Sequence, residues 1–411
     1  MRRELFQFYD SGILKSAEPV RAVRREGSFL LVGAEKSPFR PASGGQPSDR
    51  GVISGDGFYA EVEDSFEDGG LIMHRCSRFS GSISEGQKVI FEVNSQLRRA
   101  YTLMHSGEHL LFACLKRVMG EHSLSVEIDK VSIGAEESSF FVRASSLNWN
   151  LMFEAEELAN SIVKEGRAFR ISYLAPQEAL SDSDLRIKAD RIKDEFVRRV
   201  EIVGVDASAC TGTHVENTSE LKLVLVTSLK SLGSSKFEIK FKVAEHAFRE
   251  VFRHSRDFRR ISALLGRSDS VFEDTLKLWN ENRELKERHQ QDLLRRISSI
   301  TPERLFGISF YSETLEGEEQ KVIVKGMSAL CSKQAFVLLI NRTGEEKANI
   351  YLMRSSDLDS DLLEFLNNTV FSLFSGKGGG NSGFVTAELK LRRDDERILR
   401  EEVRSLILSL R

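Results

Sequence analysis

The sequence has few cysteines, no long apolar run and no large excess of either charge. Its four cysteines are scattered over 411 residues without the spacing of a disulfide framework, which excludes a disulfide-rich secreted scaffold and favours a reducing compartment. No apolar stretch approaches the roughly 20 residues of a membrane-spanning helix, and the first residues lack the apolar segment of a secretory signal. We therefore expect a cytoplasmic protein with no membrane-bound part.

The balance of charges limits the way in which the chain could contact nucleic acid. The 59 lysines and arginines against 62 acidic residues give a net charge of −3, which argues against a non-specific nucleic-acid coat. An RNA contact would need a local patch, and one basic stretch contains Arg186, Lys188, Arg191, Lys193, Arg198 and Arg199. Acidic residues interrupt this stretch, so a solvated helix face is the plainer interpretation.

Length and periodicity predict an α+β protein of several domains, because 411 residues exceed one ordinary core. Short alternating segments between turn residues predict a small β-barrel domain over 1–95. The apolar period then becomes helical from Gln96 to Met119. Further strands, a helix over 151–165 and another near 184–200 predict an α+β domain over 96–243. The run 200–210 is expected to be a strand that leads into the turn at Cys210.

The second half of the chain predicts a helical spacer and a final α/β domain. Residues 244–301 contain a single glycine and no proline, and a thin apolar seam at Leu278 and Leu285 predicts a long helix or helical hairpin. In the domain expected over 302–411, strands are predicted at 321–326, 335–341 and 348–354, and helices at 357–374 and 394–410. The GKGGGN segment between these helices (376–381) is either a flexible loop or a nest of amides that binds an anion beside Lys377.

Two motifs about a hundred residues apart supply four metal ligands. HSGEH places His105 and His109 at i and i+4 on one helix face. In CTGTH, Cys210 precedes His214 by four residues, and Gly212 between them permits a turn that brings both side chains to one point. Three imidazole nitrogens and one thiolate suit a tetrahedral zinc ion. Either motif alone would be weak support, but together they complete a ligand set for one zinc.

The order of three motifs resembles a known family. SGGQPSDRG at 43–51, HSGEHLL at 105–111 and CTGTHVENTSE at 210–220 are similar to the editing half of alanyl-tRNA synthetases and to their free-standing relatives, the AlaX proteins. In that family a glycine-rich loop with a glutamine precedes an HxxxH helix, and a CxxxH turn closes a zinc site. GKGGGN and the helical spacer resemble the C-terminal part of the same synthetases. The resemblance covers nearly the whole chain and implies the long form of the editing protein.

The resemblance implies hydrolysis, at the zinc site, of the ester that joins serine or glycine to tRNA(Ala). Because the expected barrel begins almost at residue 1, with no aminoacylation machinery before it, we expect no synthesis of alanyl-tRNA. Thr211 stands where the family often has glycine, which affects the expected shape of the pocket.

The expected roles of individual residues follow from the resemblance and their chemistry. Gln46 has both a donor and an acceptor and is expected to approach the substrate, with bracing of its turn as the alternative. Glu108 is expected to act as a general base or to support the ligands. The other expected substrate contacts are Gly44, Gly45 and Thr213, and the expected tRNA contacts are Lys377, Gly378, Gly379 and Gly380.

Three alternatives stay open at this point. HSGEH also reads as HxxEH, a metalloprotease motif, although such a protease needs an open ligand position that Cys210 and His214 would fill. A non-catalytic, zinc-stabilised tRNA-binding protein is the other rival. Four protein ligands are typical of a structural zinc, yet one thiolate with three neutral imidazoles leaves the ion Lewis acidity. A homodimer through the spacer or the C-terminal domain is a further expectation.

Overall fold

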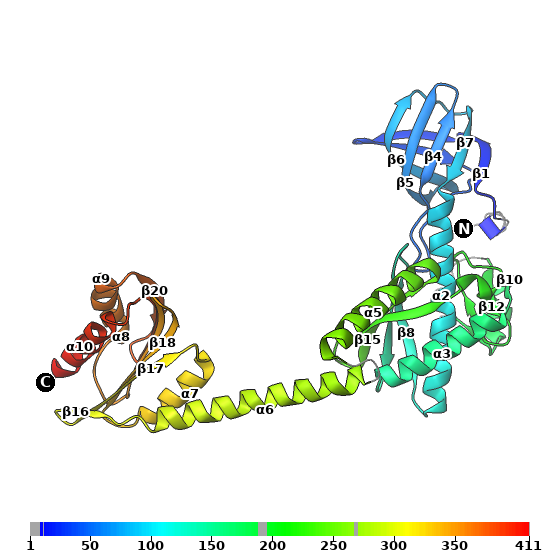
Figure 1. Ribbon diagram of the computed structural model, residues 1–411. Coiled ribbons are helices and arrows are strands. Elements are labelled where there is room, and N and C mark those ends of the chain that lie inside the picture. Colours follow the sequence, from blue (N-terminus) through cyan, green and yellow to red (C-terminus); the bar gives the residue numbers. More distant parts are fainter. Residues whose placement is uncertain (1–8, 11, 188–194, 267–269, 411) are drawn as a thin grey trace. The chain divides into compact units, whose positions relative to one another are not determined.

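The computed structural model describes residues 9–10, 12–187, 195–266 and 270–410. The chain forms two compact units, an N-terminal unit, Met1–Arg260, and a C-terminal unit, Ile261–Arg411 (Figure 1). Both helices and sheets are present throughout, so the expected α+β class is confirmed. Within the described ranges, no helix combines the length and the apolar character needed to cross a membrane. The finer division into four domains stays a prediction.

The N-terminal unit begins with a seven-stranded antiparallel sheet whose order is β1-β7-β4-β5-β6-β3-β2. The sheet curls around buried aromatic side chains such as Phe39 and Phe91. In the described chain β1 and β2 are the two ends of this order and do not pair, so the sheet is a half-barrel and the expected small β-barrel is confirmed only in part. Its strands are β1 (Lys15–Pro19), β2 (Ala22–Glu26), β3 (Phe29–Ala34), β4 (Gly51–Gly55), β5 (Phe58–Asp68), β6 (Leu71–Gly81) and β7 (Lys88–Val93).

Helix α2 (Ser95–Glu121) follows the sheet and is the central element of the rest of this unit (Figure 1). The side chain of Asn94 caps it by accepting a hydrogen bond from the amide of Leu97 at 3.0 Å. Every residue from Met104 to Leu115 is buried, because neighbouring elements enclose the helix on several sides, as expected for a helix without an exposed face.

Two further sheets and a helix surround α2, and the helices predicted at 96–119 and 151–165 are confirmed. An antiparallel sheet has the order β14-β15-β9-β8, and a smaller one has the order β10-β12-β13-β11. The elements are β8 (Val126–Ser132), β9 (Ser138–Ala144), α3 (Trp149–Glu165), β10 (Phe169–Leu174), α4 (Pro176–Ser181), β11 (Leu185–Arg186), β12 (Val197–Ile202), β13 (Asp206–Ala209), the short 3-10 helix η2 (Thr218–Leu221), β14 (Val224–Ser231) and β15 (Lys236–Val243).

The helix predicted near 184–200 is wrong at both of its described ends. These ends are the strands β11 and β12, and β12 turns back into β13, so the single strand expected over 200–210 is a hairpin. Residues 188–194, which include three members of the basic stretch (Lys188, Arg191 and Lys193), lie outside the described residues.

The described members of the basic stretch do not form a solvated helix face. Arg186 pairs with Asp206 at 2.6 Å, and Arg198 pairs with Asp10 at 2.6 Å. Arg199 pairs with Asp182 and Glu201. The carboxylate partners, which come from elsewhere in the fold, compensate these charges.

The spacer is helical, as expected, and consists of α5 (Ala244–Leu265) and α6 (Val271–Ser298). On α6 the apolar seam residues Leu278 and Leu285 are 52% and 62% exposed. The last turns of the same helix are buried against the C-terminal unit through Leu293 and Ile297. The uncovered seam leaves the expected homodimer as a prediction.

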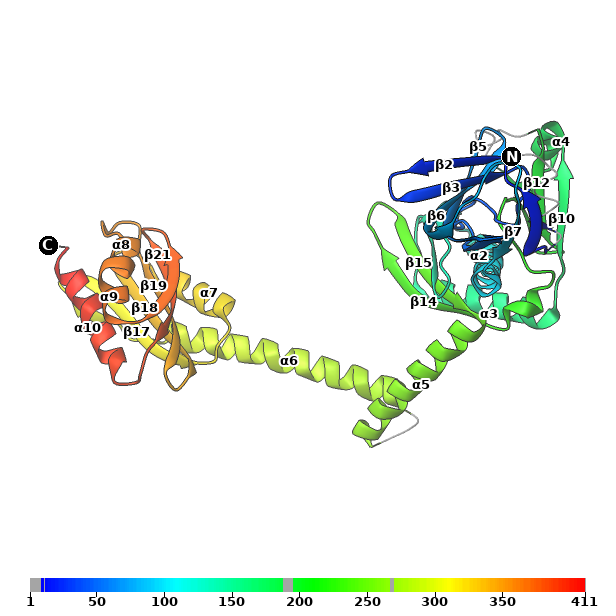
Figure 2. The same ribbon diagram turned by 90° about the horizontal axis from the view of Figure 1, so that it is seen from above.

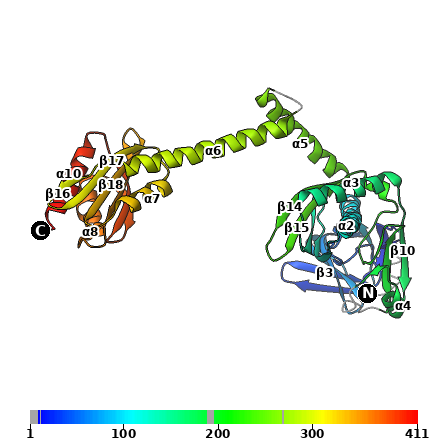
Figure 3. The same cartoon turned by 90° about the horizontal axis from the view of Figure 1, so that it is seen from below.

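The C-terminal unit is built on a six-stranded mixed sheet of order β16-β17-β18-β19-β21-β20. One face packs against α7 and the end of α6, and the other packs against α8 and α10 (Figures 2 and 3). The elements are β16 (Glu303–Leu305), β17 (Ile308–Glu316), α7 (Gln320–Leu330), β18 (Ala335–Gly344), β19 (Lys347–Arg354), α8 (Leu362–Phe365), the π-helix η3 (Leu366–Val370), α9 (Phe371–Leu373), β20 (Gly376–Gly380), β21 (Phe384–Lys390) and α10 (Asp395–Leu408).

Two predictions in this unit are wrong. The strand expected at 321–326 is the middle of α7, whose buried face includes Ile323 and Met327 and whose Gly326 lies against Ile297. Packing on α6 therefore overrides the strand preference of a Val- and Ile-rich run. The expected loop or anion nest at 376–381 is largely the edge strand β20, whose backbone pairs with β21. The role of Lys377 and its neighbours in tRNA binding stays a prediction.

His74 is a fully buried histidine in the curled sheet. Its Nε2 lies 2.7 Å from the hydroxyl of Ser37, and its Nδ1 lies 2.7 Å from the carbonyl oxygen of Val32. Burial lowers the pKa of His74 from 6.5 to about 4. Between pH 6.5 and about pH 4, His74 therefore binds a proton more readily in the unfolded chain than in the folded protein.

We expect this difference to make the folded protein less stable in acid. The contribution of neutral His74 is fully present above pH 6.5 and is lost as the pH falls toward 4. In urea unfolding, the stability of the wild type relative to His74→Gln should therefore fall by on the order of 3 kcal/mol across this window. If the difference in free energy of unfolding between wild type and His74→Gln does not change with pH, the prediction is contradicted.

Candidate metal centre

His105 and His109 lie one turn apart on α2, in its fully buried middle segment. Their ring centroids are 5.2 Å apart. The helical spacing therefore places both rings on one face, as the sequence predicts, and packing on the surrounding sheets removes both from solvent.

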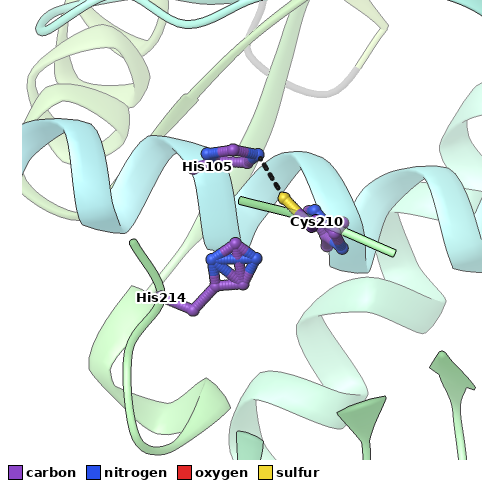
Figure 4. Close-up of side chains that lie close together, drawn as sticks. His105, Cys210 and His214 are labelled. Carbon is purple, nitrogen blue, oxygen red and sulfur yellow. Dashed lines mark hydrogen bonds between the residues drawn. The ribbon is translucent and has the colours of Figure 1, made fainter. Parts of the chain in front are cut away.

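Cys210 and His214 reach the same point from the turn that follows β13 (Figure 4). The ring of His214 lies 4.8 Å from that of His105 and 4.6 Å from that of His109. The Cys210 sulfur is 3.3 Å from Nε2 of His105. One potential ligand atom from each of the four residues lies within 4.8 Å of the other three, so the predicted ligands converge on one small volume.

The other nitrogens of two ligand histidines are held by neighbouring side chains. Nδ1 of His105 lies 2.9 Å from Oε1 of Gln46, and Nδ1 of His109 lies 2.9 Å from the hydroxyl of Ser208. When Nδ1–H donates to such a partner, Nε2 keeps its lone pair for a metal. Both ring nitrogens of His214 are buried without a hydrogen-bond partner among the described residues.

Burial sets the protonation of these groups. It lowers the pKa of His105 to about 3 and the pKa values of His109 and His214 well below the ordinary range. The rings are therefore neutral at neutral pH, as metal binding requires. Burial raises the pKa of the Cys210 thiol, while the amide of Gly212 and the charge of Arg198 oppose this rise.

The donor set fits one zinc ion. Neutral imidazoles and a cysteine sulfur are the ligands that zinc prefers, and the buried, unpartnered nitrogens of His214 would otherwise cost the fold about 1–3 kcal/mol each. A bond to a metal ion would satisfy one of these nitrogens and so remove part of this energetic cost.

The glycine-rich loop lies directly against the cluster. A side-chain carbon on Gly44 would approach His105 to 3.5 Å and the Cys210 sulfur to 3.7 Å, so the loop backbone borders the ligands. Gln46 is only 2% exposed. Its Oε1 accepts from the amide of Thr213 at 3.1 Å, and its Nε2 donates to the Thr213 hydroxyl at 3.0 Å.

These contacts place the other expected site residues. Gln46 bridges the helix and the metal turn, in agreement with the bracing role that was left open, while its predicted approach to the substrate stays a prediction. Thr213 is bound to Gln46 and to the Thr102 hydroxyl at 2.7 Å. Gly45 packs against the backbone of Val131, farther along the loop than Gly44.

Glu108 lies beside the ligands and is 3% exposed. One carboxylate oxygen is 3.8 Å from Nε2 of His109. Burial raises the pKa of Glu108 to about 7, and the nearby Arg186 partly offsets this rise. Its carboxylate forms no hydrogen bond within the described chain, so it has capacity for a proton or a ligand.

Two contacts of the metal site were not predicted. The Ser208 hydroxyl holds His109, and Nη1 of Arg198 donates to the carbonyl of Cys210 at 2.8 Å. Ser208 stands two residues before Cys210, and Arg198 appeared only as one of several basic residues, so neither carried a motif that could identify it.

Lys377 and Gly378–Gly380, the residues expected to contact tRNA, belong to the C-terminal unit, in β20.

Gly212 leaves room for the His105 ring. A side-chain carbon at this position would lie 2.0 Å from Cε1 and Nδ1 of His105, so we expect Gly212→Ala to displace the ring and weaken zinc binding by at least about tenfold. The matched control is Gly120→Ala, near the end of α2, where a side-chain carbon meets nothing within 4 Å. Titration with zinc against a chelator measures both variants, and equal zinc affinity in the two would contradict the arrangement of this turn.

Two known families match separate parts of the N-terminal unit, and neither match includes His105 or His109. The family described as tRNA synthetases class II (A) matches residues 8–97, which include the curled sheet and the glycine-rich loop. The threonyl and alanyl tRNA synthetase second additional domain matches residues 197–237, which include Cys210 and His214.

Curated relatives match most of the chain. It is 27% identical to the alanine–tRNA ligase of Thermotoga maritima over 369 residues, which is 88% of this chain and 42% of the ligase. It is 25% identical to the alanine–tRNA ligase of Xanthomonas axonopodis pv. citri over 391 residues, which is 91% of this chain and 44% of the ligase. The chain therefore spans less than half the length of these two ligases.

A third curated relative is also an alanine–tRNA ligase, and one solved domain matches part of the chain. The alanine–tRNA ligase of Desulfosudis oleivorans is 30% identical over 210 residues, 51% of this chain and 24% of the ligase. The solved C-Ala domain of Aquifex aeolicus alanyl-tRNA synthetase matches 26% of this chain and 99% of that domain at 16% identity, with a TM-score of 0.24, too low to support an argument. From the matched families and the ligases, the chain is related to the alanyl-tRNA synthetases.

Proposed function

We propose that the protein is an editing hydrolase that acts in trans and deacylates tRNA(Ala) mischarged with serine or glycine. One observation carries the proposal. The HSGEH helix, the CTGTH turn and the glycine-rich loop converge on one cluster of four potential metal ligands, two of them buried and two half-buried, in a chain that is similar to alanine–tRNA ligases over most of its length.

The selectivity of such a site has a physical basis. A synthetase pocket built for alanine cannot strongly exclude a side chain that merely adds a hydroxyl. A second site that hydrogen-bonds this hydroxyl rejects alanine, because its polar groups would then stay unpaired. Nε2 of Gln46 gives one N–H to Thr213, and its second N–H has no hydrogen-bond partner in the described chain. We assign this N–H to the substrate.

Each group at the site has a definite task in the proposed reaction. His105, His109, Cys210 and His214 would hold a zinc ion, which when bound supplies Lewis acidity at the ester. Gln46 and Ser208 keep the two helix histidines in one orientation. Glu108 is our choice for the group that accepts the proton of the attacking water, because burial raises its pKa to about 7, close to the pH at which it would work.

The deciding experiment compares two esters of the same tRNA. Zinc-loaded protein is incubated separately with seryl-tRNA(Ala) and alanyl-tRNA(Ala), and loss of the amino acid is followed in time. We expect seryl-tRNA(Ala) to be hydrolysed faster by a factor on the order of ten thousand. Cys210→Ala serves as the control and should lose both zinc and activity. Equal hydrolysis of the two esters would overturn the proposed selectivity.

Incubation with an unfolded protein, and measurement of tRNA binding beside deacylation, distinguish the alternatives. The observation that favours the HxxEH protease is Glu108, buried beside His109. Cleavage of an unfolded protein, with no effect on aminoacyl-tRNA, would establish that function. Binding of tRNA without hydrolysis would establish the non-catalytic protein.

Glu108→Gln tests the role of the carboxylate. The amide has nearly the same shape but cannot accept the proton, so we expect the rate constant for seryl-tRNA(Ala) to fall by more than about tenfold with zinc content unchanged. Because Glu108 is not one of the four ligands, zinc content serves as the internal control. A smaller loss of activity would exclude Glu108 as the general base.

The C-terminal unit has a separate proposed task. We assign tRNA(Ala) binding to Lys377 and the exposed glycines beside it on β20, since an edge strand without side chains allows close approach of a backbone. The uncovered apolar seam on α6 supports the proposed homodimer. A cytoplasmic location is part of the same proposal and agrees with the free cysteines of the described chain.

A further inference from the structure

Arg40 connects the glycine-rich loop to the metal turn. Its side chain is buried, with 1% of the residue exposed. Nε donates to the carbonyl of Thr211 at 2.9 Å, and Nη2 donates to the carbonyl of Ser43 at 3.1 Å and to the Ser43 hydroxyl. The hydroxyl of Thr211 also donates to that of Ser43 at 2.9 Å. One guanidinium thus joins two segments far apart in sequence, and both lie against the metal ligands.

Arg40 differs from the other buried arginines of the described chain, because its guanidinium has no carboxylate partner. Arg98 pairs with Asp49, Arg198 pairs with Asp10, and a third pair lies in the C-terminal unit. The carboxylate of Asp49 accepts a hydrogen bond from the backbone amide of Arg40 at 2.6 Å, and its charge favours the protonated guanidinium without forming an ion pair with it.

The guanidinium of Arg40 is also incompletely hydrogen-bonded. Its Nη1 is buried without a hydrogen-bond partner among the described residues. Burial lowers the pKa of Arg40 to about 10, which still leaves it protonated at neutral pH. A buried, unpaired positive charge with an unsatisfied N–H destabilises a fold. Folding alone therefore does not explain this arginine, whereas its hydrogen bonds to the Cys210–Thr211 turn and to the glycine-rich loop do.

We infer that Arg40 is a positioning residue of the metal site, which fixes the Cys210–Thr211 turn against the glycine-rich loop and places a positive charge on that turn. This inference rests on the metal part of the proposed function and is independent of deacylation. It predicts opposite effects of one substitution: loss of Arg40 weakens metal binding but does not weaken the metal-free fold.

Arg98→Met is the matched control, since Arg98 belongs to the same loop network but pairs with Asp49 through Nε at 2.7 Å. Zinc affinity of each variant is measured by competition with a chelator, and stability of each metal-free protein is measured by urea unfolding. We expect Arg40→Met to lower zinc affinity by about ten- to a hundredfold, with a urea midpoint equal to or above that of the wild type. Arg98→Met leaves a buried carboxylate unpaired and should lower the midpoint.

Arg40→Lys provides a test of the charge. It keeps the positive charge without the planar fork, so it should recover part of the zinc affinity lost in Arg40→Met. Equal affinity in wild type and Arg40→Met would overturn the inference, as would a lysine variant as weak as the methionine variant. A fall of zinc affinity and urea midpoint together in Arg40→Met would make Arg40 merely structural. A wild type that binds no zinc would overturn the metal site itself, and the inference with it.

Discussion

The constraint on which the site depends is the convergence of four potential metal ligands, two buried and two half-buried, on one small volume. Gln46 and Ser208 engage the far nitrogens of His105 and His109, and both nitrogens of His214 are unsatisfied within the described protein. Burial keeps all three rings neutral. A metal ion would therefore stabilise the folded chain as well as serve chemistry, because the same ligands are dispersed when the chain unfolds.

Three segments of the N-terminal unit must be in place before this cluster exists. Helix α2 carries two ligands, the turn after β13 carries two, and the loop that leaves the curled sheet contacts both through Gln46 and Arg40. The curled sheet thus supports the glycine-rich loop, and the surrounding sheets enclose helix α2. The loop borders the potential metal ligands through Gly44.

Local sequence signals were reliable where local interactions decide the structure. The capped, strongly apolar helix α2 and the alternating strands of the first sheet form where expected. The errors fall where distant partners decide. The run 321–326 has the composition of a strand but is a helix because it packs on α6, and the basic stretch near 184–200 pairs with distant carboxylates.

The sequence by itself predicted the four residues that could hold a metal ion, because helical periodicity at 105 and 109 and a short turn at 210–214 are local geometry. It also determined the order of the motifs that relate the chain to the alanyl-tRNA synthetases. Only the tertiary structure decided that Gln46 holds His105, that Ser208 holds His109 and that Arg40 stands unpaired beside the turn. These partners are brought together by packing between segments distant in sequence, and no spacing along the chain encodes such contacts.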